Sequence, residues 1–569
     1  MDLRSLALFR ILFGCYLLYD IYSRTSLGKY DIAWYTSIPD ERSFQADYDT
    51  RHHAPIHKLW FYRGTYDYQV AAFVVTAIIT AFFTIGLGFD NIIAKGVLYI
   101  VTCSYHHRNH HADGSDDFNR HFLWWFLFLP ITKVWSVDAY LAKKRKRNEQ
   151  KATKNGTLTT KDDDDASMED DNMCVSGLPC LGLLLQIVLM YIGAVVHRMD
   201  HFTPKYTGLW LSEWMPPQLS AVHWAISGTF GSRDNIIADL IRTTPLVSRT
   251  MSAMAMIGET FCPLGCLLHY QYRHIYALLL FQLHFGLFLT LNLPHWCFIG
   301  MLHQVVWIPT HVWDRLLSSQ PPETATDRAA IHKKTDGYTP TNQQENGSSE
   351  SSANGVKNEA KVRSGPTKLR PSNVVVGLLQ ELWFIYMIYS WVGFHGWIAN
   401  KIDRGDIAEG LRLNQYWAMF SAVAHTARID SVSGVFWLEP PEFDENGTIV
   451  VDPVEDGRVD LFYYLKTGEF KEADPIDFIP TNMSARFPAQ RWEKGFEAMG
   501  GLPERRERFC RTMCIFVNED RHRMGLERNI SAVEFRTQNL QIMPPGSSQR
   551  YANRKVGVDA VTTIDCSKV

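Results

Sequence analysis

Long apolar stretches recur through the first 400 residues, whereas the rest of the chain has the mixed pattern of an ordinary polar protein. Several of these stretches reach the ~20 residues that a helix needs to cross the hydrocarbon of a bilayer. The set predicts an all-α polytopic membrane bundle of about nine spans. The stretches lie at 4–22, 69–89, 91–105, 120–140, 178–197, 245–268, 274–293, 296–313 and 374–398.

Two polar, low-complexity segments interrupt this pattern, at 148–174 and 318–372. Segments so poor in apolar residues cannot bury enough surface to offset the entropy that ordering costs. We therefore expect two disordered cytosolic segments here. They separate a first membrane half at 1–147, with spans one to four, from a second half at 175–317 and a last span at 373–399.

Short apolar runs with turn residues between them fill residues 400–569. VSGVFWL, GTIVVDP, RVDLFYYL and ISAVEFRTQNLQI are typical of strands, whereas WEKGFEAMG and ERRERFCRTMCIFVNED are typical of helices. The pattern predicts an extramembrane α+β domain. Within it, Cys510, Cys514 and Cys566 offer the partners for a disulfide if their compartment is oxidising.

Basic clusters indicate which side of the membrane each loop faces. Lys143–Arg147 follow the fourth predicted span, and a second basic segment at 333–370 precedes the ninth. Basic residues concentrate in cytosolic loops, and four crossings separate these two segments, so both predict the same side. The N-terminus is then cytosolic, and residues 400–569 face the lumen of the endoplasmic reticulum or another endomembrane compartment.

Acceptor sequences for N-glycosylation fit a lumenal glycoprotein. Three lie in the C-terminal domain, at Asn446, Asn482 and Asn529. Two more lie in the predicted cytosolic loops, at Asn155 and Asn346. Only the first three can be modified if the predicted topology holds.

Several familiar site types are excluded. The net charge of −3 gives no reason to expect nucleic acid as a partner, and the cysteines form no CxxC pair and no zinc-like spacing with histidine. The sequence contains no nucleophile elbow, P-loop or dinucleotide fingerprint. His106/His110 and His107/His111 have i,i+4 spacing, but no glutamate stands between them as in HExxH, and a turn-rich segment follows. We therefore expect no metal site.

Ionisable side chains within the predicted spans are the main candidates for chemistry, because their burial in a membrane is costly. His110 is added to these side chains because it lies at the entrance of the fourth predicted span. The candidate catalytic set is therefore His110, His197, Arg198, Glu259, His284 and His295. The predicted topology places several of them at one membrane level, which predicts a buried polar cavity. In the structural alternative, Arg198 reaches the interface, Glu259 pairs with a buried base, and the histidines form a solvated rim. Arg198 could also pair with an acid such as Asp116, Asp117 or Glu259.

Several segments together resemble one known family. They are LALFRILFG, ADGSDDFNRHFLWWFLFLPITKVWSVDAYL, HFGLFLTLNLPHWCFIGML, LNQYWAMFSAV and VEDGRVDL. In order and spacing they are similar to the HTTM proteins, the membrane domains related to vitamin K-dependent gamma-carboxylase. The resemblance covers about two-thirds of the chain. It implies a membrane bundle followed by an extramembrane domain.

The carboxylase branch of that family oxygenates a reduced vitamin K and carboxylates glutamates of a propeptide-bearing substrate. A lysine near the end of the fifth span acts in that chemistry. By resemblance its position is Arg198, or His197 if the register slips. A buried lysine can lose its proton and act as a base, whereas arginine keeps its proton. The resemblance therefore implies a carboxylase-like layout without the lysine, and it alone implies a reduced quinone as cofactor.

Three functional hypotheses follow. The first is an enzyme that acts on a lipid or quinone-like ligand held between spans. The second is a non-enzymatic membrane anchor or carrier whose lumenal domain binds a protein or peptide partner. The third is gamma-carboxylase itself. The lipid bilayer is a partner in all three, and the sequence leaves open whether the chain catalyses a reaction.

Overall fold

A computed structural model describes helices along much of the chain and a C-terminal sheet. The described residues are 1–24, 67–108, 114–155, 173–199, 214, 216–228, 233, 235–317, 371–394, 426–439, 442–443, 449–451, 454–474, 503–526, 528–555 and 560–569. They form two compact units, one of Met1–Pro309 with Phe384–Val569 and one of Thr310–Trp383. The smaller unit contains α14 (Thr310–Leu317) and most of α16 (Pro371–Phe394).

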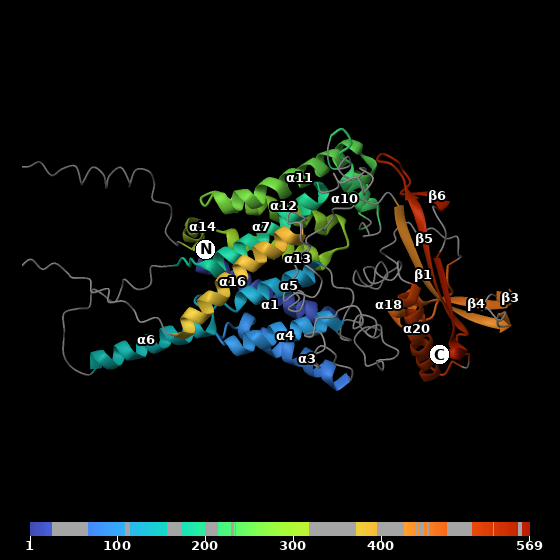
Figure 1. Cartoon of the computed structure of the whole chain (residues 1–569), viewed down its shortest axis with the longest axis horizontal. Helices are drawn as coiled ribbons and strands as arrows, with labels where there is room; N and C mark the ends of the chain where they lie inside the picture. Colours follow the sequence, from blue (N-terminus) through green and yellow to red (C-terminus); the bar gives the residue numbers. More distant parts are fainter. Residues whose placement is uncertain are drawn as a thin grey trace, which may run out of the picture. The chain divides into compact units, whose positions relative to one another are not determined.

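Helices dominate the larger unit up to Pro309 (Figure 1). They are α1 (Leu3–Arg24), α3 (Asp67–Thr80) with the π-helical η4 (Ala81–Gly86), α4 (Ile92–Arg108), α5 (Gly114–Phe126), α6 (Val137–Asn155), α7 (Leu178–Met199), α9 (Ala221–Ser227), α10 (Ile236–Thr243), α11 (Pro245–Leu268), α12 (Arg273–Thr290), α13 (Pro294–Leu302) and the 3-10 helix η7 (His303–Trp307).

Three of the described helices are long and apolar enough to cross a membrane. They cover Leu3–Ser23, Leu178–Val196 and Pro245–Leu268, at three of the positions expected from the sequence. Shorter apolar helices cover Ala71–Gly86 and Ile92–Ser104. Three such helices indicate a multi-pass membrane protein.

The stretch expected as one span at 120–140 is divided. α5 ends at Phe126, α6 begins at Val137, and Pro130 lies in the turns between them. Proline has no N–H for the helical ladder and disfavours helix at the preceding residue, so an apolar composition does not produce a continuous helix here. α6 continues through Asn155, into the segment expected as a loop, whereas residues 156–172 lie outside the described residues.

Aromatic side chains join the first helix to the fifth. Phe9 and Phe13 of α1 meet Phe122 and Phe126 of α5 edge to face, with ring centroids 5.1–5.8 Å apart. Each such pair contributes about 0.5–1.5 kcal/mol beyond the burial of area. This packing holds the start of α5 close to the end of α1, where the acidic side chains described below lie.

An antiparallel five-stranded sheet forms the core of the described C-terminal domain, with strand order β4-β1-β5-β6 and β7 paired to β5. Its strands are β1 (Thr426–Glu439), β4 (Val454–Asp460), β5 (Ala532–Ile542), β6 (Tyr551–Lys555) and β7 (Ala560–Asp565). β2 (Glu442–Phe443) pairs separately with β3 (Ile449–Val451). The sheet confirms the strands expected at VSGVFWL and ISAVEFRTQNLQI, which lie in β1 and β5.

One face of this sheet is covered by α18 (Leu461–Thr467) and α20 (Pro503–Arg523). Their core includes Phe462 and Phe509 from the helices and Val432 and Phe535 from the sheet. RVDLFYYL, expected as a strand, changes to helix at Leu461, because the Asp460 carboxylate caps α18 by accepting from two N–H groups of its first turn. Cys514 of α20 is bonded to Cys566 of η9 (Cys566–Lys568), which confirms a disulfide among the three cysteines.

Candidate functional site

A hydrogen-bonded group of buried side chains connects α7, α12 and η7. The Tyr191 hydroxyl lies 2.6 Å from Nε2 of His284 and 3.3 Å from Nε2 of His303. Nε2 of Gln304 lies 2.9 Å from the same hydroxyl and 2.7 Å from Nε2 of His303. All four side chains are at least 95% buried. A phenol therefore bridges two imidazoles away from water, and we call this group the tyrosine–histidine network.

The hydrogen bonds constrain where the protons of this network lie. Nδ1 of His303 is 2.8 Å from the carbonyl oxygen of Ile299, which can only accept, so Nδ1 carries the proton and Nε2 accepts. Nδ1 of His284 has no hydrogen-bond partner in the described part of the chain. A buried donor without a partner is rarer than a buried acceptor without one, so the proton of His284 belongs on Nε2.

This assignment gives a directional chain of donors. His284 Nε2–H donates to the Tyr191 oxygen, the Tyr191 hydroxyl donates to His303 Nε2, and His303 Nδ1–H donates to Ile299. The two amide hydrogens of Gln304 can then be donated to the Tyr191 oxygen and to the carbonyl oxygen of Gly300. The oxygen of Gln304 is the remaining acceptor, because no described residue donates to it.

A glycine and two rings hold His284 and His303 in place. A Cβ atom on Gly300 would lie 2.3 Å from Nδ1 of His284, so only glycine allows the ring to pack against this turn of α13. The Phe118 ring stacks on His303 with centroids 5.5 Å apart. Trp296 contacts both Phe118 and His284, at 5.1 and 6.2 Å. The network is therefore enclosed by aromatic surface.

A buried ion pair lies further along α7. Nη1 of Arg198 is 2.5 Å from Oε2 of Glu259 on α11, and the guanidinium lies over the Trp214 ring, 4.1 Å from its centroid. Arg198 is 1% exposed, so it does not extend to the interface. Tyr191 and Arg198 are seven residues apart and share one face of α7.

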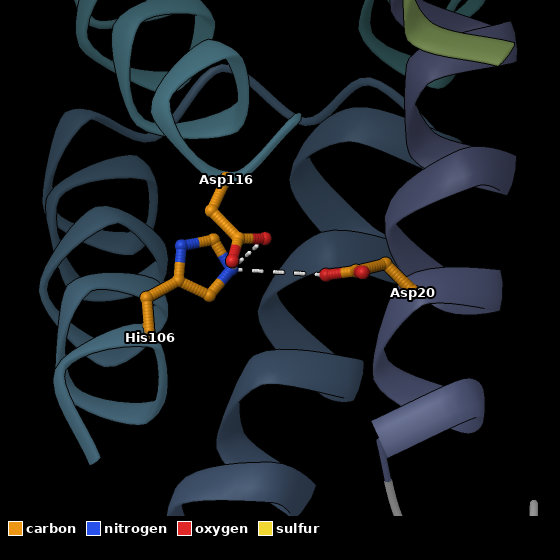
Figure 2. A group of neighbouring side chains, drawn as sticks. All are labelled: Asp20, His106 and Asp116. Carbon is orange, nitrogen blue, oxygen red and sulfur yellow. Dashed lines mark ion pairs between the residues drawn. The ribbon is translucent and has the colours of Figure 1, made fainter. Parts of the chain in front are cut away.

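A third polar group lies where α1, α4 and α5 meet (Figure 2). Nε2 of His106 points at two carboxylates, 3.7 Å from Oδ2 of Asp20 and 3.6 Å from Oδ1 of Asp116. The three ligand-type atoms lie within 4.8 Å of one another, and all three side chains are buried. We call this group the Asp–His–Asp cluster.

The Asp–His–Asp cluster has charged and aromatic neighbours. Nη1 of Arg120 lies 3.1 Å from Nδ1 of His106, and its other terminal nitrogen pairs with Asp117. On the far side, Nδ1 of His295 lies 3.6 Å from Oδ1 of Asp20. The imidazole and carboxylate groups could hold a divalent metal, because these are the donors that first-row ions accept.

The structure brings the sequence-predicted residues into different groups. His284 belongs to the tyrosine–histidine network, Arg198 pairs with Glu259, and His295 contacts the Asp–His–Asp cluster. The side chain of His197 lies outside the described residues, as does the whole of His110.

Sequence reasoning pointed to neither Asp20 nor Tyr191, and it left His106, Asp116 and His303 out of the candidate catalytic set. Asp20 carries the clearest missed signal, because an acid within an apolar helix is a functional candidate by default. Tyr191 carries none, since a tyrosine in an apolar helix is ordinary until its hydroxyl is seen to meet two imidazoles.

Comparison of the chain with protein-family models, with curated proteins and with solved structures found no match in any of the three.

Proposed function

We propose that this chain is an integral membrane enzyme that uses acid–base chemistry on a lipid or quinone-like ligand held between its helices. One observation carries the proposal: the Tyr191 hydroxyl bridges the buried imidazoles of His284 and His303. Histidine and tyrosine are common carriers of protons in catalysis, and their position away from water favours an apolar reactant.

The network supports proton transfer without movement of any side chain. When a proton enters at Nδ1 of His284, His284 can pass its Nε2 proton to the Tyr191 oxygen, Tyr191 can pass its hydroxyl proton to Nε2 of His303, and His303 can release its Nδ1 proton, so that one proton enters the network and one leaves it. Gln304 donates to the Tyr191 oxygen and so stabilises the negative charge that develops there.

Arg198 supports the proposal in a different role. Its guanidinium stays charged and cannot act as a base, so it orients Glu259 or attracts a developing negative charge. The resemblance to HTTM proteins supports the membrane setting and a quinone-like ligand, and the arginine in place of the lysine argues against carboxylation. The proposal also includes the expected position of the C-terminal domain in the lumen.

The test begins with the ligand. Lipids extracted from the detergent-purified full chain are identified by mass spectrometry. Binding of decylubiquinol and of reduced vitamin K, and their oxidation by dissolved oxygen, are then measured. We expect a bound lipid or quinone. We also expect Tyr191→Phe to lower turnover at least tenfold, because it removes the bridging proton while keeping the ring.

The matched control is Tyr99→Phe, which removes another buried tyrosine hydroxyl, on α4. Equal loss of turnover in both variants would refute a specific role for Tyr191. A purified chain that binds neither a lipid nor a quinol would favour the second hypothesis, the anchor or carrier.

A further inference from the structure

We propose that the Asp–His–Asp cluster is a binding site for one divalent first-row metal ion. Its ligands are Oδ2 of Asp20, Nε2 of His106 and Oδ1 of Asp116, contributed by α1, α4 and α5 (Figure 2). The inference does not rest on the proposed function, because a metal can be measured without any substrate.

The spacing of these atoms carries the proposal. A charge-assisted hydrogen bond between imidazole and carboxylate closes to about 2.7–2.9 Å. Here the two nitrogen–oxygen distances are 3.6 and 3.7 Å, which is too long for such bonds. Ligands that share a tetrahedral zinc at about 2.0–2.2 Å lie roughly 3.3–3.6 Å apart. The two nitrogen–oxygen distances are therefore close to those between ligands of one metal ion.

Charge and burial point the same way. Asp20 and Asp116 are both fully buried and their oxygens lie within 4.8 Å of each other. Two ionised carboxylates so close together repel, and a divalent cation between them replaces repulsion with attraction. One imidazole and two carboxylates form a mixed nitrogen–oxygen set, which suits Zn²⁺ or Mn²⁺ better than the all-oxygen preference of Ca²⁺ or Mg²⁺.

The surroundings would support a bound ion. Nδ1 of His295 lies 3.6 Å from Oδ1 of Asp20, whereas Nε2 of His106 faces Oδ2 of the same carboxylate. The His295 ring is itself stacked on Tyr19, with centroids 5.3 Å apart.

Arg120 places a condition on binding. Arginine only donates, so its contact with Nδ1 of His106 leaves the ring proton on Nε2, towards the carboxylates. An entering ion must displace this proton from Nε2. The proton either leaves to solvent or moves to Nδ1, and in the second case Arg120 must turn fully towards Asp117. Arg120 therefore opposes metal binding, and a side chain that accepts from Nδ1–H should strengthen it.

The test measures metal content and affinity in the purified full chain. The protein is stripped with a chelator, reloaded with Zn²⁺ or Mn²⁺, dialysed and analysed by mass spectrometry, with Mg²⁺ as a comparison. We expect about one ion per chain for the wild type, as for a site with three protein ligands. Asp116→Asn and Asp20→Asn should each weaken binding at least tenfold. Asp239→Asn, which removes an exposed acid on α10, should leave it unchanged.

Arg120→Gln distinguishes this site from adventitious binding. The amide oxygen of Gln accepts from Nδ1–H, so affinity should rise severalfold, whereas Arg120→Lys should not raise it. If a ligand variant fails to fold, X-ray absorption of the loaded wild type decides, because nitrogen and oxygen at about 2.0–2.2 Å are expected without sulfur at about 2.3 Å. No retained metal, sulfur ligation, or equal affinity in Asp116→Asn and the wild type would each overturn the proposal.

Discussion

At the scale of single residues, Arg198 is a fixed positive charge rather than a base. Its side chain is buried, paired with Glu259 and stacked on Trp214. Both Arg198 and Glu259 could be selected from the sequence, because each is ionisable within an apolar stretch. The sequence could not show that these two side chains pair with each other, because their pairing depends on how α7 packs against α11.

Arg198→Ala should lower the free energy of unfolding by about 3–5 kcal/mol, because it leaves the Glu259 carboxylate buried without its partner. The double variant Arg198→Met/Glu259→Leu removes both charges and should recover most of this loss. Thermal unfolding of the three detergent-purified proteins measures the effect. A single variant as stable as the wild type would show that the ion pair is dispensable for the fold.

At the scale of elements, the disulfide between Cys514 and Cys566 ties α20 to the end of β7. Cys510 lies one helical turn before Cys514, in the same core. Burial raises the pKa of the Cys510 thiol well above its usual range, so this thiol stays protonated and is a poor nucleophile towards the neighbouring disulfide. The observed pairing should therefore persist rather than exchange.

Cys566→Ser should destabilise the C-terminal domain by about 2–4 kcal/mol, because the bond closes a long loop and restricts the unfolded chain. Cys174→Ser, which changes an exposed cysteine outside the C-terminal domain, should have little effect. Chemical unfolding, followed by the fluorescence of the domain in the full chain, measures both. If mild reduction of the wild type causes no destabilisation, the bond does not contribute as expected.

The sequence predicted the elements that hydrophobic length defines and missed the features that depend on a single proline or on the packing of helices. The spans over α1, α7 and α11 were expected because hydrophobic length alone defines them. The break between α5 and α6 was missed, since Pro130 lies inside an otherwise apolar run. The Asp–His–Asp cluster was missed for another reason: its three residues come from three helices, and only packing brings them together.

At the scale of the whole molecule, the three candidate spans and the C-terminal sheet agree with a membrane part followed by an extramembrane domain. The two parts also share apolar contacts. Leu540 and Ile542 of β5 pack in one cluster with Trp224 of α9 and Met256 of α11. His223 of α9 adds a polar contact, with its Nε2 2.9 Å from the carbonyl oxygen of Met543.

Orientation in the membrane is the property of the whole chain that glycosylation can test. Asn529 belongs to an acceptor sequence and is exposed between α20 and β5, so an oligosaccharide transferase could reach it. In a eukaryotic host we expect a mass shift that is sensitive to glycosidase and survives Asn155→Gln with Asn346→Gln. Asn529→Gln should reduce the shift by one glycan, because residues 400–569 are predicted to face the lumen. Loss of the whole shift in the double variant would instead place the two loops in the lumen and reverse the predicted topology.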